Sequence, residues 1–291
     1  MLTSSAANTG CTKRHSPGLR TQTSVPAGRF FVWATLFLCI FLPGQSTQAT
    51  GTSDQAACHT SDYDEKASVK YVIDGDTVIL ADERHIRLIG INTPEIGHDG
   101  RPAQPGANQA YHYLDNLLRT QKTVFLHYDR QRLDHYQRTL AHLFLEDGTN
   151  IQALLLDKGL ATTLTIPPNL EFMDCYETSS ANAQNHRIGL WAFKKYRPTP
   201  AEFITRNDLG YCIITGRIIR VTKGKSALWI KLAKNLSLHI ANEDLPYFGN
   251  LRGWAGKQVR AKGLLYVSNG EYRMRIRHPV DMNIVATAGS D

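Results

Sequence analysis

Residues 73–95 carry the side-chain types that metal-assisted cleavage of a phosphodiester requires. In chain order these are Asp74, Gly75, Asp76, Arg87, Asn92, Thr93, Pro94 and Glu95. Carboxylate and amide oxygens are ligands for a hard divalent cation, an arginine can hold a phosphate, and a carboxylate can act as a base. An Asp-Gly-Asp turn by itself is more often an ordinary hairpin. The added Arg87, Glu95 and the later Arg138 favour hydrolysis of a phosphodiester.

This segment lies among short apolar runs that are typical of strands. Strands are predicted at residues 68–73, 76–80, 85–91, 124–128 and 139–145. The helical spacing of apolar residues predicts a helix over residues 107–119. A second helix is predicted to start at a capping box of Thr149 and Gln152 and to end at Gly159, and a third covers about residues 170–187.

Three groups of residues in this part resemble the thermonuclease family, whose members are also called staphylococcal-nuclease-like domains. They are IDGDT at 73–77, the pattern RLxGINTPE at 87–95 and DHYQR at 134–138. The resemblance covers about residues 68–193, including GLW at 189–191. It implies an OB-fold barrel of five strands with about three helices, which hydrolyses DNA and RNA with calcium.

The resemblance implies which residues surround the calcium ion. Asp76 would be a direct ligand, Asn92 would occupy the second side-chain position, and Thr93 would offer its main-chain carbonyl. Glu95 would orient or deprotonate the attacking water, and Asp74 would lie next to the metal. Calcium accepts several oxygen ligands in irregular geometry, which agrees with this donor set.

The resemblance also implies which residues hold the substrate. Arg87 and Arg138 would bind the phosphate and stabilise its growing negative charge, a task for which a bidentate guanidinium is suited. Tyr136 would hydrogen-bond to a substrate phosphate. The implied reaction is endonuclease cleavage with little sequence specificity that leaves 3′-phosphate ends.

Three departures from the family pattern bear on metal and base preference. Asn92 stands where the family often has aspartate, so one negative charge is lost and a divalent cation other than calcium becomes an option. Gln137 replaces the usual glycine before the second arginine, and the stretch TTLTIPPN at 162–169 lacks the tyrosines that stack on the base in some members. The alternative function is therefore a non-catalytic nucleic-acid-binding OB-fold protein with a weakened metal site. A cell-surface adhesion or structural protein has no specific support in the sequence.

The C-terminal part of the chain is basic. Residues 205–291 hold 14 Lys and Arg against 6 Asp and Glu, whereas residues 50–204 hold 15 against 20. Strands are predicted at residues 211–221, 226–233, 236–241, 258–267 and 271–278, which favours a second small β-barrel-like domain, with an OB-like form as one option. Strand alternation would place Arg273, Arg275 and Arg277 on one face. That face is a candidate nucleic-acid-binding surface, with a solvated barrel face as the alternative.

The N-terminal segment has the order of a secretory signal. Within residues 1–49, four basic residues precede the apolar run at 30–42, and small residues follow it up to Ala49. Export to the periplasm or the medium is expected, with no stable membrane span in the mature chain because the apolar run is shorter than roughly 20 residues. An uncleaved membrane anchor is the alternative.

The cysteine count allows one disulfide after export. Cleavage near residue 49 would remove Cys11 and Cys39 and leave an odd number of cysteines. Cys212 lies among apolar residues and is expected to be a buried thiol. Cys58 and Cys175 are therefore the candidate pair.

The sequence thus predicts a mainly β chain of α+β class with two structured parts. The expected boundaries are a signal peptide at 1–49, a linker at 50–67, a thermonuclease-like domain at 68–193, a linker at 194–210 and a basic β-rich domain at 211–285. DNA and RNA are the expected partners, no protein partner is evident, and a monomer is expected. The histidines without metal-ligand spacing are expected at the surface or with satisfied hydrogen bonds; they are His98, His112, His127 and His142.

Overall fold

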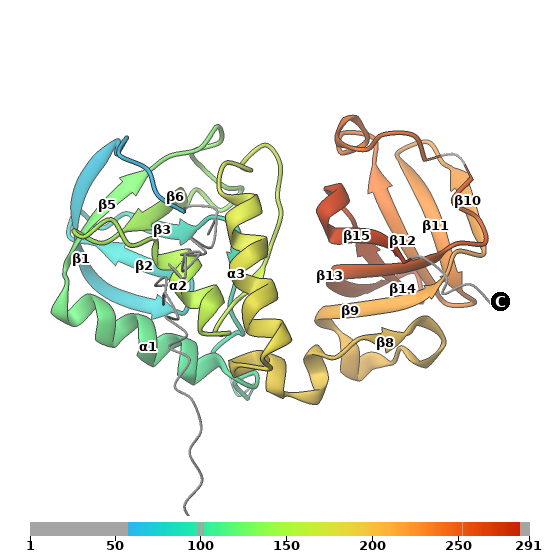
Figure 1. Ribbon diagram of the computed structural model, residues 1–291, viewed down its shortest axis with the longest axis horizontal. Helices are drawn as coiled ribbons and strands as arrows, with labels where there is room; N and C mark the ends of the chain where they lie inside the picture. The colour runs from blue at the N-terminus through green and yellow to red at the C-terminus, as the bar shows by residue number, and fades with distance from the viewer. Residues whose placement is uncertain (1–57, 98–99, 101, 252, 286–291) are drawn as a thin grey trace, which may run out of the picture. The chain divides into compact units, whose positions relative to one another are not determined.

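The computed structural model describes residues 58–97, 100, 102–251 and 253–285 (Figure 1). The predicted signal segment at residues 1–49, together with Cys11, Cys39 and His98, lies outside the described residues. The described residues all fall within one compact unit that spans Gly51–Asp291. No helix among them has the length and apolar character needed to cross a membrane.

Five strands close into a barrel in the order β1-β2-β3-β6-β5. They are β1 (Glu65–Asp74), β2 (Thr77–Leu80), β3 (His85–Leu88), β5 (Thr123–His127) and β6 (Thr139–Phe144). β1 closes the barrel because its first half pairs with β5 and its second half pairs with β2. All neighbours are antiparallel except β3 and β6, which run parallel. The predicted five-stranded barrel is confirmed.

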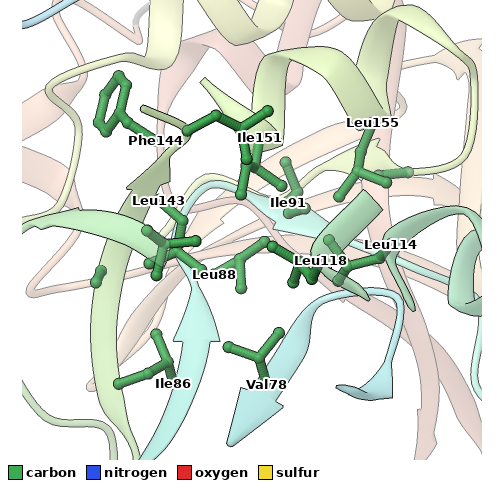
Figure 2. Packing of buried hydrophobic residues seen from close by; sticks show 14 of the residues in the cluster. Val78, Ile86, Leu88, Ile91, Leu114, Leu118, Leu143, Phe144, Ile151 and Leu155 are labelled. Atoms are coloured by element: carbon green, nitrogen blue, oxygen red, sulfur yellow. The ribbon is translucent and has the colours of Figure 1, made fainter. Parts of the chain in front are cut away.

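Three helices accompany the barrel, as predicted. They are α1 (Ala107–Thr120), α2 (Ile151–Asp157) and α3 (Met173–Asn185). α1 turns Ala110, Leu114 and Leu118 toward the strands at a spacing of four residues, and all three are buried. Figure 2 shows Leu114 and Leu118 among the buried side chains of the strands and of α2. Each fully buried leucine contributes about 1.5–3 kcal/mol, so this core holds the strand ends that carry the polar residues in place.

Helix α2 starts differently from the prediction. Its N-cap is Asn150, whose side chain accepts a backbone N–H of the first turn at 3.0 Å, so the predicted capping box of Thr149 and Gln152 is wrong. Gln152 is fully buried against β6, where its side chain accepts the N–H of Leu143 and donates to the carbonyl of Ala141, each at 3.1 Å. The need to pair buried backbone groups of β6 decides the position of this side chain.

The strand predicted over residues 85–91 is interrupted. β3 ends at Leu88, and the short strand β4 (Ile91–Asn92) pairs instead with β7 (Thr162–Thr163). Gly90 between them has a φ of +82°, and a Cβ at this position would lie 2.6 Å from the ring of Tyr176. Only glycine fits this turn, and the turn gives Asn92 a partner strand outside the barrel.

Both predicted linkers contain regular structure. β1 starts at Glu65, so the last residues of the predicted linker at 50–67 belong to the barrel. Within 194–210, β8 (Thr199–Pro200) pairs in parallel with β9 (Gly210–Arg217). A two-residue strand leaves no periodicity in the sequence that could predict it.

The C-terminal part forms an eight-stranded sheet in the order β10-β11-β12-β14-β13-β9-β8, with β15 beside β13. Its further strands are β10 (Arg220–Lys223), β11 (Ala227–Ala233), β12 (Leu236–Ala241), β13 (Gln258–Ser268), β14 (Glu271–Arg275) and β15 (Met282–Val285). The predicted β-rich character is confirmed. The strand expected over 211–221 is two strands, because the N–H of Ile218 pairs with the Lys257 carbonyl and the N–H of Ile219 pairs with the Lys231 carbonyl.

Six short 3₁₀ helices connect these elements within the described ranges. They are η1 (Gly189–Ala192), η2 (Lys194–Tyr196), η3 (Ala201–Phe203), η4 (Arg206–Asp208), η5 (Leu245–Tyr247) and η6 (Pro279–Asp281). Trp191 and Tyr196 pack with Tyr211 and Ile213 of β9 and with Ala183 of α3 in one buried cluster. This cluster joins the last helix of the barrel to the second sheet.

The cysteines of the described residues form one bonded pair and one free thiol. The Sγ atoms of Cys58 and Cys175 are bonded, and their Cα atoms lie 5.6 Å apart across 117 residues of sequence. Cys212 is free and buried, and burial raises the pKa of its thiol to about 12. The bond ties the segment before β1 to helix α3.

Candidate active site

Asp76 is the centre of the polar contacts at the turn between β1 and β2. Its side chain is buried, Oδ2 accepts the N–H of Thr93 at 2.7 Å, and Oδ1 accepts the hydroxyl of Thr77 at 3.2 Å. Nη2 of Arg87 lies 3.1 Å from the same Oδ2. A Cβ at Gly75 would lie 2.7 Å from Thr93, so glycine is required for Asp76 to reach this position.

Asp74 lies next to Asp76, and its pKa is raised. Its Oδ1 accepts the N–H of Asp76 at 3.0 Å. Burial and the neighbouring charge of Asp76 raise the pKa of Asp74 to about 6. The turn therefore holds two acidic side chains close together, and a cation between or beside them would stabilise the charged form of both.

The oxygen donors around Asp76 fit a hard divalent cation. The main-chain N–H of Thr93 binds Asp76, and the side-chain nitrogen of Asn92 donates to the Thr93 carbonyl at 3.1 Å. The Oδ1 atom of Asn92 has no hydrogen-bond partner among the described residues. Within those residues no group of three or more His, Cys, Asp and Glu side chains is arranged to hold a metal. Amide and main-chain oxygens would therefore complete the ligand set.

Glu95 follows Pro94 in the loop after β4 and is exposed. Its main-chain carbonyl accepts the N–H of Gln104 at 3.0 Å, which anchors this part of the loop. Its carboxylate has no hydrogen-bond or ion-pair partner among the described residues. The side chain is thus available to a solvent molecule or a substrate.

Arg87 lies on β3, and Arg138 directly precedes β6, the strand that pairs with β3 in parallel. Arg87 pairs with Leu140, two residues after Arg138. Both arginines line one cavity of about 580 Å³, whereas Asp76, Asn92 and Glu95 do not line it. A cavity with two guanidinium groups in its wall can hold a phosphate.

Each arginine is held by a carboxylate. The carboxylate of Asp134 accepts hydrogen bonds from Nε of Arg138 at 2.7 Å and from the backbone N–H of Arg138 at 2.9 Å. The two Nη atoms of Arg138 have no partner among the described residues. Gln137, just before Arg138, has a φ of +64°, the left-handed region that favours glycine. The backbone thus keeps a conformation suited to the glycine that this sequence lacks.

Tyr136 lies close to Arg138 but at the surface. Its ring is 69% exposed, the Arg138 guanidinium carbon lies 5.4 Å from its centroid, and the His135 ring lies 3.7 Å from it. His135 lines the cavity, but Tyr136 does not. The predicted phosphate contact of Tyr136 stays a prediction.

The three arginines of the predicted nucleic-acid-binding face have different surroundings. Met274 and Ile276 are fully buried, as strand alternation predicts for the opposite face. Arg273 lies over Trp229, with its guanidinium carbon 4.8 Å from the ring, and Arg275 pairs with Glu243 and Asp244. Arg277 lines the same cavity as Arg87 and Arg138, which no local pattern in the sequence could indicate.

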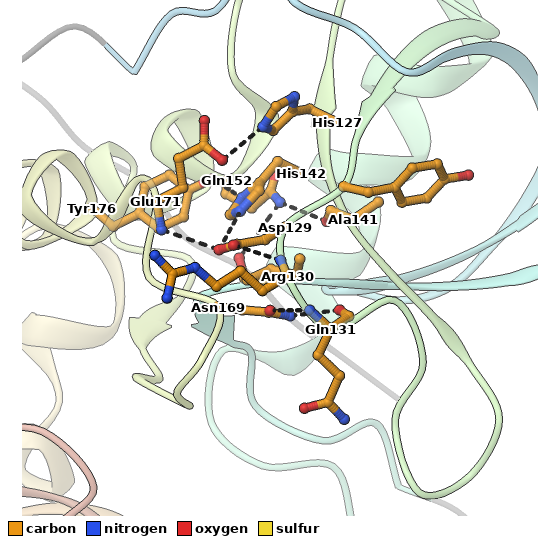
Figure 3. Close-up of polar contacts among 12 residues, drawn as sticks. His127, Asp129, Arg130, Gln131, Ala141, His142, Gln152, Asn169, Glu171 and Tyr176 are labelled. Atoms are coloured by element: carbon orange, nitrogen blue, oxygen red, sulfur yellow. Dashed lines mark hydrogen bonds and ion pairs between the residues drawn. The ribbon is translucent and has the colours of Figure 1, made fainter. Parts of the chain in front are cut away.

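A separate polar cluster underlies the loop after β7 (Figure 3). His127 binds the Asp62 carbonyl at 2.7 Å and Glu171 at 2.8 Å. His142 is fully buried, binds the hydroxyl of Tyr176 at 2.8 Å, and has Nε2 3.9 Å from Asp129, beyond hydrogen-bond distance. These contacts give both histidines a structural role.

Comparisons with known proteins agree with this arrangement. Residues 85–193 match the family model described as staphylococcal nuclease homologue. A thermonuclease of Staphylococcus intermedius is 39% identical over 127 residues, which cover 42% of this chain and 74% of the relative. A thermonuclease of Staphylococcus hyicus is 34% identical over 124 residues, 42% of this chain and 72% of the relative.

A probable endonuclease of Pyrenophora tritici-repentis is also similar, with 31% identity over 114 residues that cover 37% of this chain and 41% of the relative. The two thermonucleases are matched over most of their own length. These similarities support a hydrolase that acts on phosphodiester bonds. The chain belongs to the family of staphylococcal nuclease homologues.

Proposed function

We propose that this chain is an exported, metal-dependent endonuclease that hydrolyses DNA and RNA with little sequence specificity and leaves 3′-phosphate ends. The observation that carries the proposal is that Arg87 belongs both to the contacts of Asp76 and to the cavity wall. This side chain is bound to Asp76 at 3.1 Å and also lines the cavity with Arg138. A phosphate in that cavity would meet two guanidinium groups, one of which also contacts the carboxylate of Asp76.

The metal site is proposed to consist of Asp76, Asn92 and the carbonyl of Thr93, with calcium as the expected ion. When bound, such a cation supplies positive charge to a phosphate oxygen and acidifies a bound water. Thr77 and the Thr93 N–H fix the carboxylate of Asp76 through hydrogen bonds at 3.2 and 2.7 Å. The donors are thus oriented before the substrate arrives.

Arg87 and Arg138 are proposed to hold the scissile phosphate. Asp134 occupies the Nε edge of Arg138, so both Nη atoms remain to donate to phosphate oxygens. Arg87 donates from Nη1 to the Leu88 carbonyl at 2.6 Å, which fixes the direction of its guanidinium. Fixed donors stabilise the negative charge that grows on the phosphate in the transition state.

Glu95 is proposed to orient the attacking water and to accept its proton. The carboxylate is exposed and carries no internal hydrogen bond within the described residues, so it can bind a water molecule without breaking an existing contact. The water proton passes to Glu95, the water oxygen attacks phosphorus, and the bond from phosphorus to the 5′-oxygen breaks. The leaving 5′-oxygen takes up a proton from solvent and becomes a hydroxyl. The 3′ end keeps the phosphate.

Little sequence specificity is expected from the groups that line the cavity. Arginines contact phosphates, which are the same in every nucleotide. Leu164, Ile166, Pro167 and Pro168 in the cavity wall carry no aromatic ring and no hydrogen-bonding side chain that would read a base edge. The amide of Asn169 in the same wall is already bound to the backbone of Gln131.

The test is cleavage of single-stranded DNA and RNA by four proteins. Wild type and the Arg220→Gln control, which changes an exposed arginine outside the cavity, should cleave both substrates in calcium. Glu95→Gln and Arg87→Gln should lower kcat by at least about a hundredfold. Product ends should become extendable by a polymerase only after phosphatase treatment. Equal rates for all four proteins would refute the assigned site.

Asn92 favours a second candidate, a nucleic-acid-binding barrel without catalysis. An amide in place of a carboxylate removes one negative charge from the ligand set. In that case wild type would bind single-stranded DNA in calcium, manganese or magnesium and cleave it in none of them. The same four proteins and a binding measurement therefore separate the two functions.

A further inference from the structure

The cavity that contains Arg87 and Arg138 is only partly made by the family domain. Its wall also includes four residues of the second sheet and its connections, Glu243, Asp244, Tyr247 and Arg277. The family model matches residues 85–193 and so contains none of these. The substrate side of the cavity therefore includes chemistry that the family domain does not supply.

The acids in this wall already have cationic partners. Glu243 and Asp244 both pair with Arg275, and Asp244 lies 2.7 Å from it. Asp134 pairs with Arg138. Arg138 thus compensates Asp134, whereas Glu243 and Asp244 share the single charge of Arg275, and their remaining negative charge acts on the nearby Arg277.

Arg277 is the cation of this wall without a counterion. It makes no hydrogen bond and no ion pair with any described residue, although it is half-buried. Burial and the nearby Arg275 lower the pKa of Arg277, but an arginine stays protonated at neutral pH. A partly desolvated guanidinium without a partner is stabilised when an anion binds to it.

Tyr247 supplies the aromatic surface that the barrel loop lacks. This residue is 37% exposed at the end of η5, and its ring centroid lies 5.7 Å from that of the His278 ring. The loop residues of the same wall, including Pro167 and Pro168, carry no aromatic ring on which a base could stack. A base beside the scissile phosphate would therefore find two aromatic rings in this cavity, His135 and Tyr247, of which only Tyr247 comes from the C-terminal part.

Direct contacts fix this wall against the barrel loop. Thr165 donates to Asp281 at 3.2 Å, and Lys262 donates to Thr163 at 3.1 Å and pairs with Glu177. Burial raises the pKa of Asp281 to about 7. These partly buried contacts, together with the buried cluster around Trp191, hold the second sheet in register with the loop that follows β7.

We propose that Arg277 and Tyr247 form a second nucleotide subsite for the same single strand of nucleic acid. Arg277 binds the phosphate next to the scissile one, and the neighbouring base stacks on Tyr247. The proposal rests on the proposed function because it takes the phosphate between Arg87 and Arg138 as the scissile one. Through this subsite, the second sheet would make the enzyme prefer substrates longer than one nucleotide.

The binding test uses a labelled single-stranded oligonucleotide and the full chain in EGTA, where no cleavage is expected. Arg277→Gln should weaken binding about tenfold and lower the slope of log affinity against log salt by about 0.7, the value of one phosphate contact on a single strand. Tyr247→Ala should weaken binding about tenfold with an unchanged slope. The control Arg220→Gln should match wild type. Wild-type affinity and slope in both variants would overturn the subsite.

The kinetic test compares that oligonucleotide with a nitrophenyl ester of thymidine phosphate, which carries one scissile phosphodiester. Arg277→Gln and Tyr247→Ala should lower kcat/KM at least about tenfold more for the oligonucleotide than for the small ester. An equal loss on both substrates would overturn the subsite, since it would point to damage at the scissile phosphate. Absence of cleavage by wild type would instead contradict the proposed function, and the binding test would still decide the subsite.

Discussion

At the scale of single residues, the candidate active site depends on a few hydrogen bonds around Asp76. Thr77 and Thr93 fix its carboxylate, and Arg87 lies within ion-pair distance. In this arrangement Asp76 is the one carboxylate proposed as a direct ligand. The charge of the metal site is therefore set by Asp76 and by its neighbour Asp74.

Asn92→Asp should strengthen calcium binding. The change adds one negative charge at a position where Oδ1 has no partner among the described residues. One charge at ligand distance is worth about tenfold in affinity after solvent screening. Calorimetric titration of calcium without substrate measures this directly. An affinity equal to or weaker than that of wild type would contradict the ligand role of Asn92.

Gln137→Gly should raise the free energy of unfolding by about 0.5–1 kcal/mol. The φ of +64° at Gln137 is strained for a residue with a Cβ, and glycine relieves this strain. The gain is reduced because glycine also gives the unfolded chain more conformational freedom. Urea denaturation provides the measurement. The matched control is Gln121→Gly, at a φ of −125°, which should lower stability. A loss in both variants would rule out strain at Gln137.

At the scale of elements, the polar cluster of Figure 3 ties the barrel strands β5 and β6 to the segment before α3. Burial lowers the pKa of His127, but the hydrogen bonds with Glu171 and with the Asp62 carbonyl outweigh it, and the pKa is raised. Asp64 also lies 3.7 Å from this ring. The protonated form of His127 is therefore favoured in the folded chain.

His127→Gln should destabilise the protein more at pH 5.5 than at pH 8.5. A raised pKa contributes stability that is fully present below about pH 6.5, the value for an unfolded chain, and is lost as the pH rises through the folded value. Urea midpoints at the two pH values measure the difference. An equal loss at both would show that the charge of His127 does not contribute.

His142 provides a control because its pKa is shifted in the opposite direction to that of His127. Burial lowers its pKa despite the nearby Asp129, so its contribution is present above about pH 6.5 and is lost as the pH falls. The wild-type protein should lose stability toward pH 5.5 through this residue. His142→Gln should lack that loss, even if it is less stable at neutral pH.

The disulfide connects the segment before β1 with α3 across a long loop. Replacement of Cys58 and Cys175 by serine should lower the free energy of unfolding by about 2–4 kcal/mol, because closure of a 117-residue separation restricts the unfolded chain. Thermal unfolding with and without a reductant measures this. The reductant should shift the wild type but not the double variant, and a shift of neither would contradict the bond.

Sequence reasoning succeeded for elements with a local cause. The turn at 73–77 and the pairing of Thr77 with Arg87 follow from residues close in the chain, so Asp76 and Arg87 could be expected together. The break at Gly90 depends on the ring of Tyr176, which comes more than eighty residues later. The capping residue of α2 depends on backbone groups of β6, so the local pattern of Thr149 and Gln152 predicted the wrong cap.

At the scale of the whole molecule, the position of Arg277 could not be predicted. Strand alternation predicts one face for Arg273, Arg275 and Arg277, but β14 ends at Arg275, so Arg277 lies beyond the strand. Its place in the cavity depends on the buried cluster around Trp191 and on the contacts of Lys262 and Asp281. Such contacts between distant segments leave no pattern along the chain.

The same long-range packing changes what the basic second sheet is expected to do. Arg275, Lys231 and Lys262 each pair with an acid, so the excess positive charge of residues 205–291 is only partly free for phosphates. These ion pairs are partly buried, so salt screens them less than it would screen exposed pairs. The sheet is therefore best understood through Arg277 and Tyr247, which line the cavity.

The most direct test of the central claim is a calcium switch on the purified chain. Wild-type protein is incubated with single-stranded DNA in EGTA, calcium is then added in excess, and the products are followed by size and by end group. Cleavage that starts on calcium addition, gives 3′-phosphate ends and is lost in Glu95→Gln is the predicted result. Full-length DNA in calcium, manganese and magnesium alike would contradict the account.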